Sequence, residues 1–235
     1  MSEDLREVIA AYDRIYSAKG IRDSDSYYAW IAKLMALAPG SSVLDVACGE
    51  GLFLKYAERR ELQTFGVDIS PVALKVAQGN LKAPRLFQAD GEALPFRTGQ
   101  FAGVACLGSL EHYLHPEKGL REIRRVLAND GIAALALPNS YYLVDIVWQV
   151  WRTGHGPDNK QEVERFATVR EWEAFLESGG LQVLRVYKHN FRFPRSLADL
   201  RFYRSRPRKI LNLLVAPFVP FNLSNSFVFI CRKRT

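Results

Sequence analysis

A turn of small residues separates an apolar run from a helix in the first quarter of the chain, and its chemistry suits a bound ligand. Residues 42–46 are typical of a buried strand, and residues 52–57 begin a helix. Gly49 and Gly51 let the backbone approach a ligand closely, and the helix N-terminus presents free N–H groups. Asp45, inside the strand end, would repel a pyrophosphate but would attract an ammonium or sulfonium group. The spacing predicts a cradle for a cationic ligand, with an ordinary tight turn as the alternative.

A second acid ends the next apolar run, residues 63–69. Asp68 lies 23 residues beyond Asp45. An acid about twenty residues after such a turn is placed to accept hydrogen bonds from ribose hydroxyls. Ser70 and Pro71 then begin a helix, as N-cap and first helical residue. We therefore expect Asp68 to point into a crevice above the sheet, rather than to be a solvated loop acid.

Two further strand ends carry polar groups. Residues 85–89 are typical of a third strand and lead to Asp90, whereas residues 101–107 form a fourth that leads to Glu111 and His112. The carboxyl ends of parallel strands meet at one edge of a sheet, where ligands bind at the point at which the strand order reverses. The residues expected to converge there are Asp45, Gly49, Asp68, Asp90 and Leu107.

Residues 43–51 resemble motif I of the class I S-adenosylmethionine-dependent methyltransferases, in which an acid-x-small-x-Gly-x-Gly turn wraps the amino acid half of the cofactor. Residues 89–96 and 101–112 resemble two further family patterns, "A-D-x-x-x-L-P-F" and "F-D-x-V-x-x-x-x-x-L-E-H". Ala102 departs from the second pattern, since an acid commonly follows the Phe. The resemblance covers about residues 40–140 and is close to the branch that includes the ubiquinone- and menaquinone-pathway methyltransferases.

This resemblance implies S-adenosylmethionine as the cofactor. It also implies that Asp90 bonds the adenine amino group and that Gly91 supplies a backbone N–H. The cofactor-binding residues that we expect are Asp45, Ala47, Gly49, Gly51, Asp68, Ile69, Asp90, Gly91, Leu107 and Tyr16.

The activity so implied is transfer of a methyl group to a small-molecule or lipid-like acceptor by in-line displacement (EC 2.1.1 class). The protein must mainly position the acceptor and exclude water, and a hydroxyl acceptor also needs a base. His112 is the candidate catalytic residue; Glu111, His115 and His155 are the other candidates, and no metal site is predicted. One alternative is a non-catalytic module of the same fold that binds a nucleotide-like ligand. A dehydrogenase is disfavoured because the G-x-G-x-x-G pattern lacks its third glycine and because of Asp45.

The fold that we predict is α/β, a Rossmann-like seven-stranded, mostly parallel sheet with an antiparallel last strand and helices on both faces. The chain of 235 residues suits one such domain, residues 40–235, behind an N-terminal helical cap of residues 1–39. The remaining strands are expected at residues 132–137, 181–187 and 226–232, and a helix is expected at 117–127.

Two inserts lie between the later strands: the first resembles the segment of family members that holds the acceptor, and the second is far longer than the short hairpin that the family has there. Residues 138–168 form an acceptor-side insert, in which residues 141–152 are apolar on all sides and must be buried or face a substrate or bilayer. Residues 188–224 mix arginines with large apolar side chains, which predicts either an interfacial membrane element or a lid that packs on the domain. Nucleic acid ranks below lipid as a partner, because no nucleic-acid-binding module surrounds this insert.

Charge is unevenly distributed along the chain. Residues 1–180 carry 20 Lys and Arg and 24 Asp and Glu, whereas residues 181–235 carry 12 and 1, net −4 and +11. This asymmetry indicates an acidic partner for the C-terminal part. Three scattered cysteines predict a reduced, cytoplasmic setting. The acidic N-terminus predicts that there is no signal peptide, and no apolar run reaches the roughly eighteen residues that a spanning helix needs. We expect it to be peripheral on the inner face of the membrane if the basic insert binds lipid.

Overall fold

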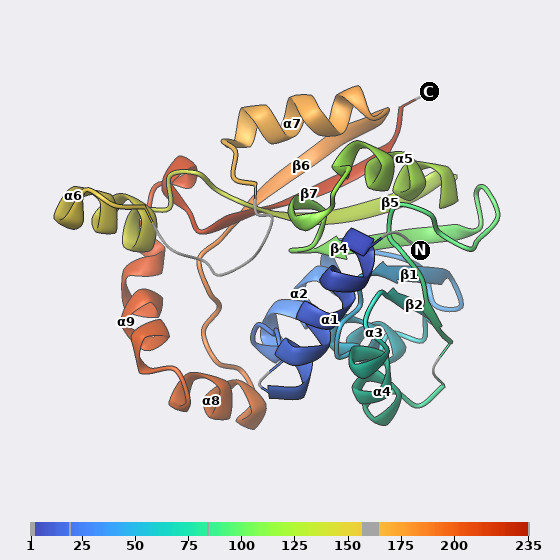
Figure 1. Ribbon diagram of the computed structural model, residues 1–235, viewed down its shortest axis with the longest axis horizontal. Coiled ribbons are helices and arrows are strands. Elements are labelled where there is room, and N and C mark those ends of the chain that lie inside the picture. Colours follow the sequence, from blue (N-terminus) through green and yellow to red (C-terminus); the bar gives the residue numbers. More distant parts are fainter. Residues whose placement is uncertain (1–2, 19, 84, 157–164, 235) are drawn as a thin grey trace.

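A seven-stranded sheet forms the middle layer of the computed structural model, in the order β3-β2-β1-β4-β5-β7-β6 (Figure 1). The structure describes residues 3–18, 20–83, 85–156 and 165–234. Only β7 runs antiparallel to its neighbours, which confirms the predicted fold class. The strands are β1 (Ser42–Val46), β2 (Gln63–Asp68), β3 (Leu86–Gln88), β4 (Phe101–Leu107), β5 (Leu127–Pro138), β6 (Leu181–His189) and β7 (Ser226–Lys233).

Helices cover both faces of this sheet. In the described ranges they are α1 (Glu3–Ala18), α2 (Asp25–Leu34), α3 (Leu52–Glu58), α4 (Pro71–Asn80), α5 (Pro116–Val126), α6 (Trp148–Thr153), α7 (Val169–Ser178), α8 (Leu197–Arg204) and α9 (Pro207–Val215). Short turns of 3₁₀- or π-helix are η1 (Leu110–His112), η2 (Leu143–Val147), η3 (Ala216–Phe218) and η4 (Phe221–Leu223).

The alternation of side chains along the strands divides the apolar core into two layers. Leu44 of β1 packs with Ile123 of α5 and Leu176 of α7 on one face. Val43, the preceding residue of β1, packs with Ile31 of α2 and Phe53 of α3 on the other. Successive residues of a strand point to opposite faces, so a strand buried on both sides is a continuous apolar run. Burial of both layers fixes the register that brings the strand ends level.

The boundary between α5 and β5 differs from the prediction. We expected Asn129 to Gly131 to end the helix, but α5 ends at Val126 and these residues lie within β5. Phe101 pairs with Leu127 and Gly103 with Ile132, so one residue of β4 opposes four residues of β5. The turn-forming residues are therefore accommodated in a bulge at the strand start, rather than in a loop before it.

The connection from β6 to β7 contains α8 and α9, and α8 is fastened to the cap by one buried carboxylate. Asp199 accepts hydrogen bonds from the Ser26 amide (2.9 Å), the Ser26 hydroxyl (2.5 Å) and the Arg195 amide (2.9 Å). Burial acts to raise the pKa of Asp199, but these hydrogen bonds outweigh it and hold the pKa below its usual range. The C-terminal insert and the N-terminal cap are thus joined directly, although 173 residues separate Ser26 from Asp199.

We predict that Asp199→Ala lowers the free energy of unfolding by about 2 kcal/mol, because the buried donors of Ser26 and the amide of Arg195 lose their charged acceptor. Urea unfolding at neutral pH measures the change, with the exposed Asp130→Ala as control. A carboxyl whose folded pKa is lowered stabilises the fold above its unfolded pKa of about 4 and loses that contribution as the pH falls through the folded value. The difference between wild type and variant should therefore narrow in acid; an acid-independent difference would contradict this role.

Candidate cofactor and acceptor site

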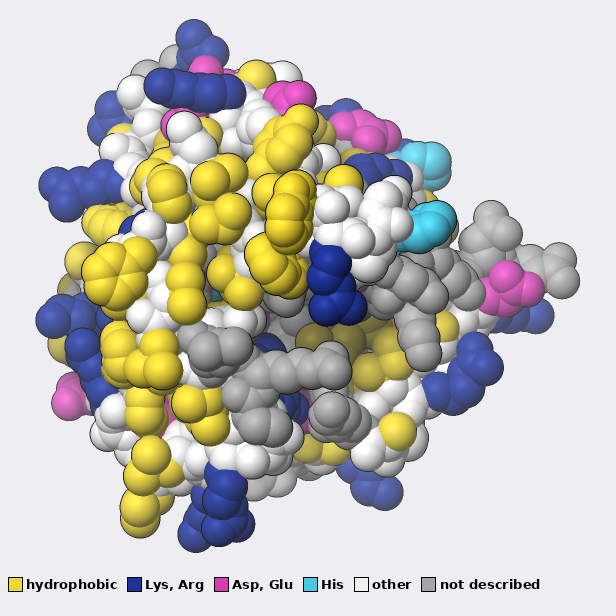
Figure 2. All heavy atoms as spheres, turned by 90° about the vertical axis from the view of Figure 1, so that its left-hand side faces the viewer, with side chains coloured by type: hydrophobic (Ala, Val, Ile, Leu, Met, Phe, Trp, Pro, Cys, Tyr) yellow, Lys and Arg dark blue, Asp and Glu magenta, His cyan; other side chains and the backbone are white. Residues whose placement is uncertain are grey.

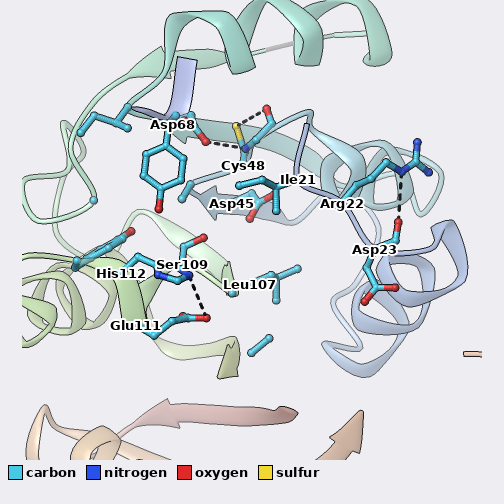
Figure 3. A pocket seen from close by; sticks show the side chains of 18 of the residues that line it. Ile21, Arg22, Asp23, Asp45, Cys48, Asp68, Leu107, Ser109, Glu111 and His112 are labelled. Atoms are coloured by element: carbon cyan, nitrogen blue, oxygen red, sulfur yellow. Dashed lines mark hydrogen bonds and ion pairs between the residues drawn. The ribbon is translucent and has the colours of Figure 1, made fainter. Parts of the chain in front are cut away.

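A cavity of about 370 Å³ lies along the carboxyl edge of the parallel strands (Figure 3). Ligand sites typically enclose about 300–1,000 Å³. Its wall includes at least one residue from or directly after every strand, and these are, in sheet order, Asp90, Asp68, Asp45, Leu107, Pro138, Ser226 and His189. The cavity thus crosses the reversal of strand order between β1 and β4, where α/β sheets bind ligands.

The turn after β1 is held in an unusual backbone conformation. Ala47, Gly49 and Gly51 all have left-handed φ angles, +58°, +51° and +73°. At Ala47 this conformation costs about 1–2 kcal/mol, a strain that is typical of ligand-binding turns. A Cβ on Gly49 would lie 2.8 Å from the Tyr16 hydroxyl, so α1 closes over a glycine that has no room for a side chain.

Asp68 joins this turn to β2. Its carboxylate accepts hydrogen bonds from the amide of Gly49 (2.8 Å) and from that of Ser70 (2.9 Å). Burial raises the pKa of Asp68 above its usual range, although both amides act to lower it. Each carboxylate oxygen accepts about two hydrogen bonds, so Asp68 has capacity for a ligand hydroxyl beyond these two amides. Asp13 of α1 also hydrogen-bonds the Ser70 hydroxyl, which places the cap directly over this corner.

Asp45 is a second buried carboxyl in the same cavity. Only 3 % of the residue is exposed. Burial, and then the nearby charge of Asp68, raise the pKa of Asp45 well above its usual range. A cation placed between two such groups favours their ionised forms and would lower both pKa values. The electrostatics therefore suit a positively charged ligand group.

The β3 end of the cavity combines a carboxylate with flat apolar walls. The Asp90 carboxylate accepts the Glu92 amide (2.9 Å), which orders the loop. A Cβ on Gly91 would lie only 2.0 Å from the Tyr113 hydroxyl, so the tyrosine ring passes directly across this glycine. Ile69 and Leu107 also line the wall. This arrangement suits a planar, hydrogen-bonding group.

The structure brings nearly the whole predicted cofactor set together. Tyr16 lines the cavity, and burial followed by the Asp68 charge raises the pKa of its hydroxyl, so it stays protonated. The exception is Gly51, which lies outside the wall. It is the left-handed N-cap of α3, and a Cβ there would lie 3.1 Å from that of Ala77 on α4. The glycine at 51 therefore serves the packing of two helices.

The candidate bases from the sequence are separated by the structure. His112, on η1, lines the cavity with its Nε2 3.8 Å from the Glu111 carboxylate (Figure 3). His115 and His155 are exposed and do not belong to the cavity wall. Part of the predicted acceptor-side insert, residues 157–164, lies outside the described residues.

A histidine–carboxylate pair that sequence reasoning missed lies at the opposite end of the cavity. His189 Nε2 is 3.0 Å from Asp23 Oδ2, and both residues line the wall. Burial acts to raise the pKa of Asp23, but the charge and hydrogen bond of His189 outweigh it and hold the pKa below its usual range. The Tyr27 ring lies 4.4 Å from the imidazole and fixes its plane. The position of His189 at the end of a predicted strand was a usable signal, but nothing in the sequence points to Asp23.

Both the sequence and the fold are similar to those of known proteins. Residues 44–135 match the family model described as a methyltransferase domain. A 149-residue alignment, 33 % identical, relates 63 % of the chain to an uncharacterized protein of Methanocaldococcus jannaschii but spans only 54 % of that relative's length. The ubiquinone biosynthesis O-methyltransferase of Pseudomonas paraeruginosa is 28 % identical over 66 % of the chain and 69 % of its own length.

Solved structures show the same fold over nearly the whole chain. A 1,6-didemethyltoxoflavin-N1-methyltransferase from Burkholderia thailandensis, with bound 1,6-didemethyltoxoflavin and S-adenosylhomocysteine, superposes with a TM-score of 0.62 at 16 % identity, covering 98 % of this chain and 87 % of that one. The [4+2]-cyclase SpnF superposes with a TM-score of 0.69 at 18 % identity, covering 98 % and 97 %.

We predict that Asp68→Ala weakens binding of S-adenosylmethionine by about 10- to 100-fold, the usual effect of losing hydrogen bonds to a charged acceptor. Isothermal titration calorimetry of wild type and variant measures the affinity, and Asp130→Ala controls for the lost negative charge. Equal affinities for wild type and Asp68→Ala would exclude a ribose contact at this position.

Proposed function

We propose that this chain, a member of the class I S-adenosylmethionine-dependent methyltransferases, transfers a methyl group to a hydroxyl of a small, largely apolar acceptor by in-line displacement. One observation carries this proposal. Asp45, Asp68 and Asp90, at the ends of three adjacent strands, line a single cavity whose buried carboxyls favour a cation. S-adenosylmethionine supplies such a cation, a sulfonium whose methyl group leaves without acid catalysis.

The strand order supports the following proposal for which residues hold each part of the cofactor. Asp68 would accept the ribose hydroxyls, and Asp90 with the Gly91 amide would bond the adenine edge at the β3 end. Asp45 and the turn that contains Gly49 would hold the amino acid half near β1. Ile69 and Leu107 would enclose the base and exclude water from it.

The opposite end of the cavity suits the acceptor. Ile21, Tyr27, Tyr28 and Leu137 supply apolar and aromatic walls there. Polar side chains of Arg22, Asp23, His189, Asn225 and Ser226 lie in the same wall, and this mixture favours an apolar molecule with one or two hydroxyls. The O-methyltransferases of ubiquinone biosynthesis, among the similar proteins, are named for oxygen methylation, which agrees with this choice.

Two histidines are candidates to take the acceptor proton. His112 lies beside Glu111, nearer the centre of the cavity edge. His189 is oriented by Asp23, which would accept its Nε2–H and leave Nδ1 to receive a proton. The imidazole of His189 is held by the 3.0 Å contact with Asp23 and by the neighbouring, tilted Tyr27 ring, so we assign the base role to His189 and a wall or orienting role to His112.

A non-catalytic ligand-binding module is the alternative. Fold likeness alone does not decide between them, because the same fold serves a protein that is named a cyclase. A pure binding module needs no oriented histidine, so the dyad favours catalysis.

We predict that His189→Gln lowers the rate of methyl transfer by at least about 100-fold, the usual contribution of a general base. The measurement follows transfer of a radiolabelled methyl group from S-adenosylmethionine to catechols with alkyl tails of increasing length. Binding of S-adenosylmethionine should be unchanged in the variant, because His189 lies away from the residues assigned to the cofactor.

His112→Gln is the matched control and should transfer the methyl group at a rate much closer to that of the wild type. Alkaline pH should partly rescue His189→Gln, because a phenol with a pKa of about 10 then ionises without a base. The opposite pattern would move the base role to His112, and absence of transfer to every acceptor with cofactor binding intact would favour the binding module.

A further inference from the structure

One face of the molecule, formed by α6, α8, α9 and the turns η3 and η4, exposes large apolar side chains that the methyl-transfer site does not use. Figure 2 shows these side chains gathered on that face, with Lys and Arg around its edge. Trp151 is 74 % exposed and Phe218 is 84 % exposed. The other members of this apolar face are Tyr141, Trp148, Phe193, Leu197, Leu200, Leu214 and Phe221. We expected residues 141–152 to be either buried or facing a substrate or bilayer, and in the structure α6 faces outward.

Arginines are exposed on or beside the elements of the apolar face. They are Arg152, Arg195, Arg201 and Arg204. The only acid in residues 181–235 is Asp199, and it is fully buried against Ser26. The insert therefore exposes Arg195, Arg201 and Arg204, while its single carboxylate is used inside.

We propose that this apolar face docks on a bilayer that contains anionic lipids. Tryptophan, phenylalanine and leucine would enter the interface between headgroups and acyl chains, and the arginines would lie at the phosphates. None of the helices in the described ranges could cross a bilayer, so the binding is interfacial. Each arginine near anionic lipid contributes about 1 kcal/mol.

Other occupants fit this face less well. A two-fold dimer would place the arginines of one copy against the same arginines of the other, which is electrostatically unfavourable. A single-stranded nucleic acid could stack its bases on the aromatic rings of this face, but it would leave Leu197, Leu200 and Leu214 exposed to water, whereas a bilayer covers both kinds of side chain.

The apolar face borders the acceptor end of the cavity. The Asn139 side chain donates hydrogen bonds to the carbonyls of Asn222 (2.9 Å) and Ser224 (2.8 Å), which joins the segment before α6 to that after α9. The residues adjoining these contacts, Pro138 and Asn225, line the cavity. An apolar acceptor dissolved in the bilayer would thus meet the cavity beside the docking face. This route rests on the proposed function, whereas lipid binding itself does not.

Flotation with vesicles tests the proposal. We expect the full chain to float with phosphatidylcholine vesicles that contain phosphatidylglycerol, less so at high salt, and weakly with phosphatidylcholine alone. Arg201→Gln with Arg204→Gln should weaken partition about 30-fold, since two charges at about 1 kcal/mol each are lost. Trp151→Ser with Phe218→Ser should weaken it comparably or more.

Matched controls lie on other faces. Arg60→Gln with Arg121→Gln removes two exposed charges, and Val76→Ser with Leu184→Ser removes two exposed apolar side chains. Both control pairs should float as wild type does. Thermal melting and S-adenosylmethionine binding should be unchanged in the docking-face variants, which separates lost docking from lost folding.

Three outcomes would overturn the proposal. The first is no flotation of the wild type, and the second is equal flotation of the docking-face and control variants. The third is a wild-type dimer, measured by light scattering, that dissociates in the variant Trp151→Ser with Phe218→Ser while the variant still floats as the wild type does. Flotation as expected in a protein that does not bind S-adenosylmethionine would leave docking intact and refute the proposed function instead.

Discussion

The structure depends on one costly arrangement, the placement of two carboxyl groups at adjacent strand ends where water does not reach them. Asp45 and Asp68 are almost fully buried in the same cavity, and burial raises the pKa of both. Asp68 offsets part of this cost by accepting the Gly49 and Ser70 amides, and so fixes the turn that shapes the site. The remaining cost makes the cavity selective for cations, because a bound cation interacts favourably with both ionised carboxylates, whereas a neutral or anionic molecule does not.

Polar contacts add to the apolar packing of α2 in holding the cap and the insert over this cavity. Asp13 bonds Ser70 on the cofactor side, Asp23 pairs with His189 on the acceptor side, and Asp199 bonds Ser26 behind them. Each contact joins an element outside the sheet to a strand end or to the cap itself. Such contacts are directional, so they position α1 and α2 well, yet they bury little apolar area. These contacts therefore set the orientation of the cap, while the apolar side chains that α2 buries in the core stabilise its attachment.

Local patterns made the cofactor half of the site predictable. Asp45, Asp68 and Asp90 each follow a short apolar run, and the parallel topology then requires their side chains to meet. The acceptor half was not predictable in this way. Asp23 and His189 are 166 residues apart, and only the packing of the cap onto β6 brings them together. Gly51 shows the converse limit, since a motif position read as ligand contact instead serves the packing of α3 on α4.

The placement of β7 between β5 and β6 has a consequence for how such proteins diversify. His189 and Ser226 are paired residues, so the chain leaves the sheet after β6 and re-enters it at the same edge. The whole connection between β6 and β7 therefore begins and ends at the same place on the sheet. Its length and composition can change without disturbing strand register, and the cofactor half lies on other strands. The connection between β6 and β7 can therefore differ in length and composition without moving the strands that carry Asp45, Asp68 and the segment before Asp90.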